Sequence, residues 1–363
     1  MIVYIRVDTS NEIGTGHVMR CLTLAKRLRT YKAAVTFICR ELTGHLCAWI
    51  EGNGFNVVKL PSPSTHVHLP LFTKHSHWLG VPLMVDAAQT KAILAEEEET
   101  VDLLIIDHYA INREWEGHLR KVVKKIMVID DLADRMHDCD FLMDQNIFVD
   151  YQNRYFSLVP PHCKTFLGPS YVLLRTEFYE QRKKLKRRIG PVKRILIFFG
   201  GIDSTNETGK ALAAFLRLGR SDIHVDVVVG QSNCQKQVLA SICEQYENLH
   251  FHCQVNTMAE LLGHADLSIG AGGTTTWERC YLGVPSIVWS VAENQEEICE
   301  TLARNKIINY LGKKEQIEQT FLSRQLQILI DNEAECSEMS RLSSLLMKDN
   351  FVNQRTMVAE IMR

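Results

Sequence analysis

The sequence lacks the features that mark membrane-spanning, secreted and polyanion-binding proteins. No apolar run approaches the ~18 residues of a transmembrane helix. The first eight residues are charged by the sixth position and lack the basic-then-apolar layout of a signal peptide. Lys and Arg total 41 against 43 Asp and Glu, a net charge of −2, which leaves no electrostatic footprint for nucleic acid or an anionic membrane surface. We therefore expect a cytoplasmic protein that binds neither nucleic acid nor membranes.

Metal-ligand spacings are missing as well. The 11 cysteines include no CxxC pair, and an odd, unclustered set in a chain this long is typical of reduced thiols in the cytoplasm. The 14 histidines include close pairs, such as His75 and His77. None of them is joined to Cys or carboxylates at metal-ligand spacing, so the sequence predicts no metal site.

The chain is instead a globular α/β sequence long enough for two domains. It has 363 residues, of which 46% are hydrophobic and 23% charged. In the first half, short apolar runs alternate with helical stretches such as 16–31, a pattern that indicates a parallel sheet covered on both faces. The predicted strands of this half are 2–7, 35–39, 57–60, 103–106 and 126–129.

The second half repeats the scheme, with predicted strands at 195–199, 225–229, 267–269 and 287–289 and helices at 206–218 and 274–282. A basic run at 182–188, closed by Gly190-Pro191, separates the halves. We interpret the run as a solvated helix end, with a phosphate-attracting patch as the alternative. We expect domains at 1–185 and 190–363, with amphipathic helices after about residue 307 completing the second. Ligands of such sheets bind beyond the carboxyl ends of the strands.

A glycine-containing turn follows the first predicted strand. Asp8 ends that strand, Gly14 and Gly16 lie in the turn, and a helix opens near Gly16. The glycines permit close backbone approach, and helix-start N–H groups suit an anion. His17 lies in the first helical turn, where a neutral imidazole can accept a proton near neutral pH. The alternative is a capping loop with an incidental histidine, since the turn matches neither a GxGxxG nor a Walker pattern.

A second turn follows the strand at 267–269. The backbone N–H groups of Gly272, Gly273 and Thr274, with threonine hydroxyls, suit a diphosphate. Glu278, one turn into the next helix, is placed to accept hydrogen bonds from ribose hydroxyls. The alternative is a helix N-cap followed by an ordinary first-turn glutamate, which also fits the helix dipole.

Three shorter signals lie at strand ends. The turn at 199–206, which contains Gly201, is a candidate phosphate or hinge turn. Asp107-His108-Tyr109 ends a strand of the first half, and the stretch 292–295 with Asn294 follows a strand of the second. For each of these, packing is the alternative to ligand contact.

These motifs together resemble one enzyme family. The run Arg6-x-Asp8-x-Ser10…Ile13-Gly14-x-Gly16-His17-x-x-Arg20-x-x-x-Leu24-Ala25 is similar to the signature of the UDP-2,4-diacetamido-2,4,6-trideoxy-β-L-altropyranose hydrolases of pseudaminic acid biosynthesis. His77-Trp78-Leu79-Gly80-Val81 resembles a loop of the longer members. Further matches, in order over about residues 3–300, are Ile106-Asp107-His108-Tyr109, Ile129-Asp130-Asp131, Asp144-Gln145-Asn146, Leu174-Arg175-x-Glu177-Phe178, Gly200-Gly201-x-Asp203 and Glu293-Asn294-Gln295.

The resemblance implies a GT-B-like fold, in which two Rossmann-like domains with parallel sheets face a central cleft. It implies that the first domain carries the catalytic histidine and the second binds UDP. Water would attack the anomeric carbon with inversion, without a metal or other cofactor, and release UDP. The free sugar would serve flagellin or surface-glycan modification. The resemblance makes no prediction of oligomeric state.

The resemblance also assigns roles to residues. His17 is expected to be the base, Tyr109 to orient water or sugar, and Asp8 to position His17 or bind sugar hydroxyls. The sugar-nucleotide contacts are expected from Gly14, Gly16, Arg175, Gly201, Gly272, Gly273, Thr274, Glu278 and Asn294. Two alternatives stay open. One is a glycosyltransferase of the same fold using a UDP-amino-sugar donor, for which Leu69-Pro70-Leu71-Phe72 is a candidate membrane-facing patch. The other is a non-catalytic binding module.

Overall fold

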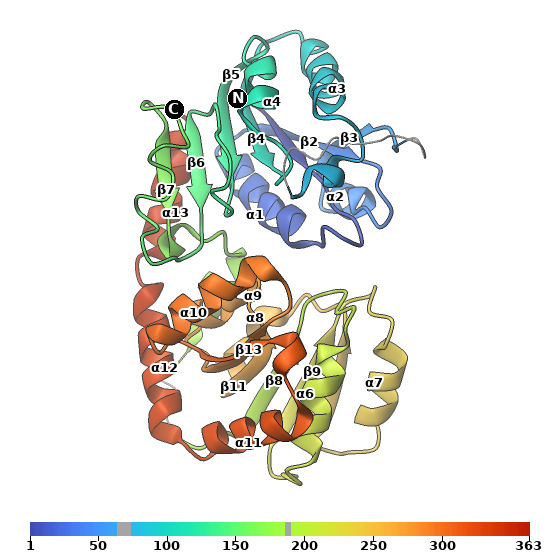
Figure 1. The fold of residues 1–363 in the computed structure, drawn as a ribbon, viewed down its shortest axis with the longest axis vertical. Helices are drawn as coiled ribbons and strands as arrows, with labels where there is room; N and C mark the ends of the chain where they lie inside the picture. Colours follow the sequence, from blue (N-terminus) through green and yellow to red (C-terminus); the bar gives the residue numbers. More distant parts are fainter. Residues whose placement is uncertain (64–73, 186–189) are drawn as a thin grey trace. The chain divides into compact units, whose positions relative to one another are not determined.

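The structure, a computed structural model, describes residues 1–63, 74–185 and 190–363. The apolar stretch at 69–72 and positions 186–188 of the basic run lie outside the described residues. Two compact units are present (Figure 1), one made of Met1–Asn146, Asp150–Leu173 and Val352–Arg363, the other of Ile147–Val149 and Leu174–Phe351. No helix among the described residues is long and apolar enough to span a membrane.

The first unit is built on a seven-stranded, fully parallel sheet of order β3-β2-β1-β4-β5-β6-β7. All five strands expected from the apolar runs are confirmed. The two shortest, β6 and β7, were not expected, because four residues carry too little pattern. The strands are β1 Ile2–Val7, β2 Ala34–Arg40, β3 Asn56–Leu60, β4 Val101–Asp107, β5 Val123–Ile129, β6 Phe141–Asp144 and β7 Lys164–Leu167.

Helices cover both faces of this sheet because alternate residues of each strand point to opposite sides. Along β1, Val3, Ile5 and Val7 join the apolar cluster that contains the buried stripe of α1, whereas Tyr4 joins the cluster that contains Trp115 of α4. The helical elements of the unit are α1 Gly16–Thr30, α2 Cys47–Gly52, η1 Ser76–Leu79, α3 Leu83–Ala95, α4 Arg113–Leu119 and η2 Pro169–Tyr171.

The end of the chain also packs on the first unit. Helix α13 (Asn350–Ile361) contributes Met357, Val358 and Ile361 to the apolar cluster on the α1 side of the sheet. Lys164, at the start of β7, forms an ion pair with Glu360. The amphipathic pattern after residue 307 indicates helices, but it does not specify the sheet against which the last of them packs.

The second unit contains a six-stranded, fully parallel sheet of order β10-β9-β8-β11-β12-β13. The four expected strands are confirmed, and the two unexpected ones, β10 and β13, are the edge strands, whose partial exposure weakens the apolar signal. The strands are β8 Arg194–Phe198, β9 His224–Val229, β10 Leu249–Cys253, β11 Leu267–Ala271, β12 Ser286–Ser290 and β13 Asn309–Lys313.

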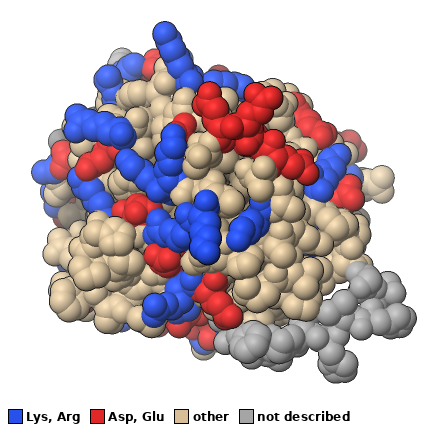
Figure 2. All heavy atoms as spheres, turned by 90° about the horizontal axis from the view of Figure 1, so that it is seen from above, with Lys and Arg blue, Asp and Glu red and all other residues tan. Residues whose placement is uncertain are grey.

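Helices flank this sheet as well. They are α5 Thr176–Lys184, α6 Glu207–Leu216, α7 Lys236–Cys243, α8 Met258–His264, α9 Thr275–Tyr281, η3 Glu293–Gln295, α10 Glu296–Arg304, η4 Lys314–Gln316, α11 Gln319–Ile330 and α12 Glu333–Leu346. Of these, α6, α7, α11 and α12 share an apolar cluster with the strands. On the face shown in Figure 2, basic and acidic side chains are interspersed, in keeping with the near-equal totals of 41 and 43.

Candidate functional site

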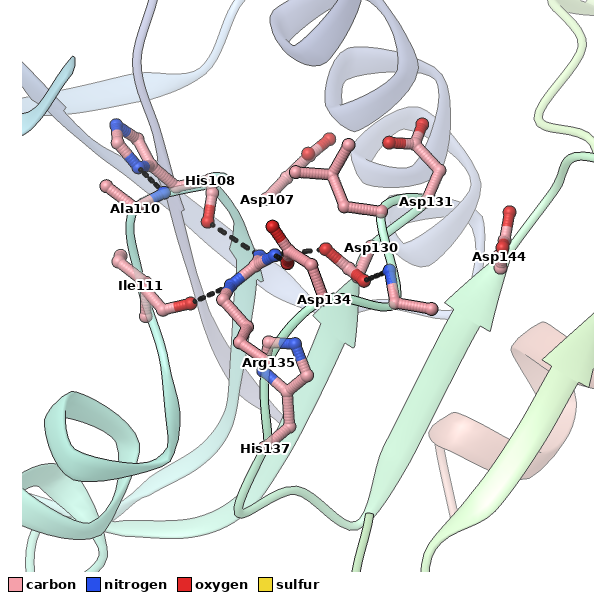
Figure 3. Close-up of polar contacts among 12 residues, drawn as sticks. Asp107, His108, Ala110, Ile111, Asp130, Asp131, Asp134, Arg135, His137 and Asp144 are labelled. Carbon is pink, nitrogen blue, oxygen red and sulfur yellow. Dashed lines mark hydrogen bonds and ion pairs between the residues drawn. The ribbon is translucent and has the colours of Figure 1, made fainter. Parts of the chain in front are cut away.

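A row of acidic residues marks the carboxyl ends of four neighbouring strands in the first unit. Asp8 follows β1, Asp107 ends β4, Asp130 and Asp131 follow β5, and Asp144 ends β6. Figure 3 shows those of β4, β5 and β6 at the strand ends. Because parallel strands bring their carboxyl ends to one edge, side chains far apart in sequence meet there.

His17 lies at this edge, in the first turn of α1, where the sequence places it. Its Nδ1 is 2.6 Å from Oδ1 of Asp107. Arg20, one turn further along α1, approaches the same carboxylate with Nε at 2.5 Å and Nη2 at 2.6 Å, and reaches Asp131 with Nη1 at 2.9 Å. Burial opposes ionisation of Asp107, but the charges of Arg20 and His17 outweigh it and hold its pKa well below the usual range.

This arrangement fixes the orientation of the imidazole. A carboxylate only accepts hydrogen bonds, so the short contact assigns a proton to Nδ1 of His17, which donates to Asp107. In the neutral ring Nε2 is then the proton acceptor. The side chain of His17 is 9% exposed and that of Asp107 is fully buried, so the pair is shielded from competing water. In this tautomer the ring presents Nε2 as a proton acceptor, which is the arrangement that a general base requires.

Tyr109 lies next to His17. Its ring centroid is 4.7 Å from that of His17, edge to face. Burial raises the pKa of Tyr109 well above its usual value, so the phenol keeps its proton. Arg135 holds the loop that carries Tyr109: its Nε donates to the carbonyl of Ile111 at 2.6 Å while its Nη2 pairs with Asp130 at 2.8 Å (Figure 3).

Asp8 occupies a different network from the one expected. Its carboxylate accepts from the Arg6 guanidinium at 2.6 and 2.8 Å and from the backbone N–H of Arg40 at 2.6 Å. Despite burial, the charge of Arg6 keeps the pKa of Asp8 well below its usual range. The carboxylate that contacts His17 is that of Asp107, not that of Asp8. The sequence signal for Asp107 is the Asp-His-Tyr motif at the end of β4. Because β4 is the neighbour of β1 in this sheet, that motif lies beside the turn that leads from β1 to His17.

The turn before α1 is shaped by glycine. Gly14 has φ +78°, a left-handed conformation that L side chains rarely adopt, and its N–H donates to the carbonyl of Ser10 at 3.0 Å. Gly16 begins α1, and Thr15, at the N-cap, provides no side-chain cap. Among the described residues, no group of three or more His, Cys, Asp or Glu side chains is arranged to hold a metal ion.

In the second unit, the β11–α9 turn is built from backbone rather than charge. A Cβ at Gly272 would overlap Sγ of Cys299 on α10, so a larger residue would require the side chain of Cys299 to move. Gly273 has ordinary space, and Thr274 makes no side-chain cap to α9. Beneath the turn, Nη2 of the buried Arg279 donates to the carbonyl of Ala271 at 2.6 Å. Burial lowers the pKa of Arg279 to about 10.

Two further expected residues meet beside this turn. Arg175 contacts Glu278 through Nη2 at 3.0 Å, and burial raises the pKa of Glu278 against the opposing charge of Arg175. Asn294 is exposed in η3. The neighbouring Gln295 accepts from the N–H of Val291 at 3.0 Å and lies next to Gly272 and Gly273.

The turn that contains Gly201 differs from the β11–α9 turn. Asp203 accepts from the N–H groups of Glu207 and Thr208 at 2.8 and 2.9 Å, and Asn206 accepts from Gly209 N–H at 3.2 Å. The amides at the start of α6 are thus bound to the chain's own side chains. A phosphate could bind these amides only if the side chains that cap them moved away.

Residues 194–353 match the family model of the glycosyltransferase family 28 C-terminal domain. The chain is 27% identical over 84% of its length to the UDP-2,4-diacetamido-2,4,6-trideoxy-beta-L-altropyranose hydrolase of Campylobacter jejuni, covering 97% of that protein. It is 25% identical over 92% of its length to the spore coat polysaccharide biosynthesis protein SpsG of Bacillus subtilis, covering 90% of it. It is also 27% identical over 82% of its length to an uncharacterized protein of Methanocaldococcus jannaschii, of which it spans only 57%.

Solved structures identify the fold. MurG of Acinetobacter baumannii superposes with a TM-score of 0.67 at 14% identity, covering 99% of both chains. Phytolacca americana UGT2, solved with UDP-2fluoro-glucose and pterostilbene, gives 0.68 at 14% identity and covers 100% of both. The protein has the GT-B-like α/β fold of these glycosyltransferases.

Proposed function

We propose that the protein hydrolyses UDP-2,4-diacetamido-2,4,6-trideoxy-β-L-altropyranose to UDP and the free sugar, in the cytoplasm and within pseudaminic acid biosynthesis. The observation that carries the proposal is the His17–Asp107 pair at the carboxyl edge of the first sheet. Similarity over nearly the whole length of the Campylobacter jejuni hydrolase supports the choice of substrate.

In the proposed reaction, Nε2 of His17 accepts a proton from water as the water oxygen bonds to the anomeric carbon. The bond from that carbon to the phosphate oxygen breaks, and UDP leaves with the electron pair. Attack opposite the leaving group inverts the configuration. Asp107 holds the ring of His17 and stabilises the imidazolium as it forms. Tyr109, as a protonated phenol, orients the water or the sugar.

We assign the nucleotide to the second unit. Gly272, Gly273 and Thr274 would offer backbone N–H groups to the diphosphate, whose developing negative charge such groups stabilise. Glu278, held by Arg175, would accept from ribose hydroxyls, and Asn294 would contact the uridine. Gly201 is not included, because the amides that follow its turn are capped.

The test is an NMR time course of EDTA-treated protein with the UDP-sugar and no acceptor. We expect free sugar, first in the inverted anomeric form, and UDP in equal amount. His17→Ala should lower the rate by about 10²- to 10⁴-fold while UDP binding stays unchanged, because the histidine belongs to the other unit. Full activity in His17→Ala would refute the assignment of the base, and an unchanged spectrum with the wild type would refute hydrolysis.

The second candidate is transfer of the sugar to an acceptor. It is favoured by the match of residues 194–353 to the glycosyltransferase family 28 C-terminal domain. UDP release that depends on an added acceptor would decide for transfer.

A further inference from the structure

A cluster of aromatic rings adjoins His17, and the proposed mechanism uses only part of it. The indole of Trp78, in η1, stacks on Tyr109 with centroids 5.4 Å apart and planes 23° apart. The same indole is 6.2 Å from the ring of His17, edge to face. His75 lies 4.5 Å from Trp78 and 5.3 Å from Tyr109. The rings of His75 and Trp78, at η1, thus gather around His17 and Tyr109.

A carboxylate fixes the position of this segment. Oε1 of Glu12 accepts from Nε1 of Trp78 at 3.2 Å and lies 2.6 Å from Nε2 of His77. Glu12 belongs to the turn that leads from β1 to His17, so η1 and the catalytic turn are tied directly to each other. The side chains of Glu12 and His77 are 63% and 42% exposed, and exposed pairs contribute little to stability. The bond that orients the indole ring is therefore better explained by positioning than by folding.

The burial of the rings suggests a use. Tyr109 and His17 are buried, whereas Trp78 and His75 are half-buried. An aromatic face beside a polar reacting group is the usual make-up of a small-molecule site, where apolar rings pack on the ligand and a few polar groups orient it.

We propose that Trp78, stacked on Tyr109 and oriented by Glu12, forms the wall that packs against the apolar edge of the sugar, its deoxy carbon and acetamido methyl groups. The inference rests on the proposed function, because it takes the sugar of that reaction as the ligand. Trp78 is then a specificity-determining residue and Glu12 a positioning residue. The wall favours 6-deoxy, N-acetylated UDP-sugars over fully hydroxylated ones.

Kinetics with variants test the wall. Trp78→Ala should raise KM for the UDP-sugar at least 10-fold with a smaller change in kcat, while affinity for UDP alone changes less than two-fold. Trp78→Phe should restore most of the loss, and Glu12→Gln, which keeps an acceptor, should stay closer to wild type than Glu12→Ala. Trp49→Phe is the matched control, since Trp49 is also partly exposed but lies on α2. An unchanged KM in a folded Trp78→Ala protein overturns the inference.

Binding separates this inference from the hydrolysis proposal. Intact UDP-sugar should change tryptophan fluorescence beyond the change caused by UDP, and Trp78→Phe should abolish that difference while Trp49→Phe keeps it. If the wild type binds the sugar in this way without releasing UDP, the wall stands and hydrolysis falls. If UDP and UDP-sugar bind equally tightly and give the same signal, the wall falls, whether or not UDP is released.

Discussion

The two units build their candidate sites from opposite materials. In the first, buried side-chain charges neutralise one another: Arg20 is shared by Asp107 and Asp131, with His17 against the same Asp107. In the second, the turn before α9 consists of backbone and glycine, with Gly272 packed against Cys299. The first site is therefore sensitive to the loss of a charge, and the second to the addition of an atom.

The difference suits the two tasks of the proposed function. Moving a proton requires a base with a fixed tautomer, which needs a charged partner out of water. Holding a diphosphate requires several N–H groups at close range, which a side chain beyond Cα would obstruct. We therefore expect the first unit to be harmed most by the loss of a buried charge and the second by an added methyl group.

Asp107→Asn should have the largest effect on stability. Removing one charge from a buried pair leaves its partner uncompensated, at a cost of about 3–5 kcal/mol in the free energy of unfolding. Because Arg20 keeps its contact with Asp131, we expect a cost at the lower end of that range. The amide can also donate to Nδ1 of His17, which would move the ring proton to Nε2 and remove the base, so kcat should fall as well. Urea unfolding and the UDP-release assay check both effects.

The control is Asp134→Asn. Asp134 also contacts an arginine, at 2.7 Å, but is 41% exposed, and Arg135 keeps its buried partner Asp130. The loss should stay below about 1 kcal/mol. Equal losses in the two variants would contradict the view that the first site depends on buried charge.

The sequence predicts the strands and helices of this site better than the contacts between its side chains. Apolar runs ending in Asp or Gly locate the strands, and the helix that begins at Gly16 places His17 correctly. The partner of His17 is 90 residues away, and its identity follows only from β1 and β4 being neighbours. A turn motif shows which residues lie at a strand end, but not which of them meet.

The two Gly-Gly turns also differ in a way that the sequence does not show. The Gly-Gly pairs at 200–201 and 272–273 read alike, yet side chains cap α6 after the first while none caps α9 after the second. Asp203 and Asn206, which make those caps, adopt positive φ values of 46° and 56°. Sequence spacing does not reveal that conformation, because most Asp and Asn residues do not adopt it.

Gly272→Ala and Gly201→Ala test the difference between the two turns. The new methyl at 272 overlaps Cys299, so we expect a loss of about 1–3 kcal/mol in stability and weaker UDP binding by calorimetry. At 201 nothing lies within 4 Å of the added Cβ, and stability should change by less than about 1 kcal/mol with UDP affinity unchanged. Weaker UDP binding in Gly201→Ala alone would move the nucleotide to the α6 turn.

The titration of Asp144 should make the stability of the first unit depend on pH near neutrality. Burial and the charges of Asp131 and Asp130 raise its pKa to about 8, against the N–H of Asn146 and the charge of Arg154. Between the ordinary pKa of Asp, about 4, and about 8, the folded protein holds a proton that the unfolded chain releases. This group therefore contributes stability at low pH that is lost as the pH rises through that window.

Asp144→Asn removes the titration and keeps the shape. The stability of the variant relative to wild type should rise between pH 5 and 7, by at most about 1.4 kcal/mol per pH unit, the limit for one proton. Urea unfolding at several pH values measures this difference, and subtraction cancels the contributions of the other groups. Asp150→Asn, at an exposed carboxylate, should give a flat difference. A flat difference for Asp144→Asn as well would mean that Arg154, 2.7 Å from the carboxylate, keeps it ionised at neutral pH, so that the edge is balanced by ion pairs alone.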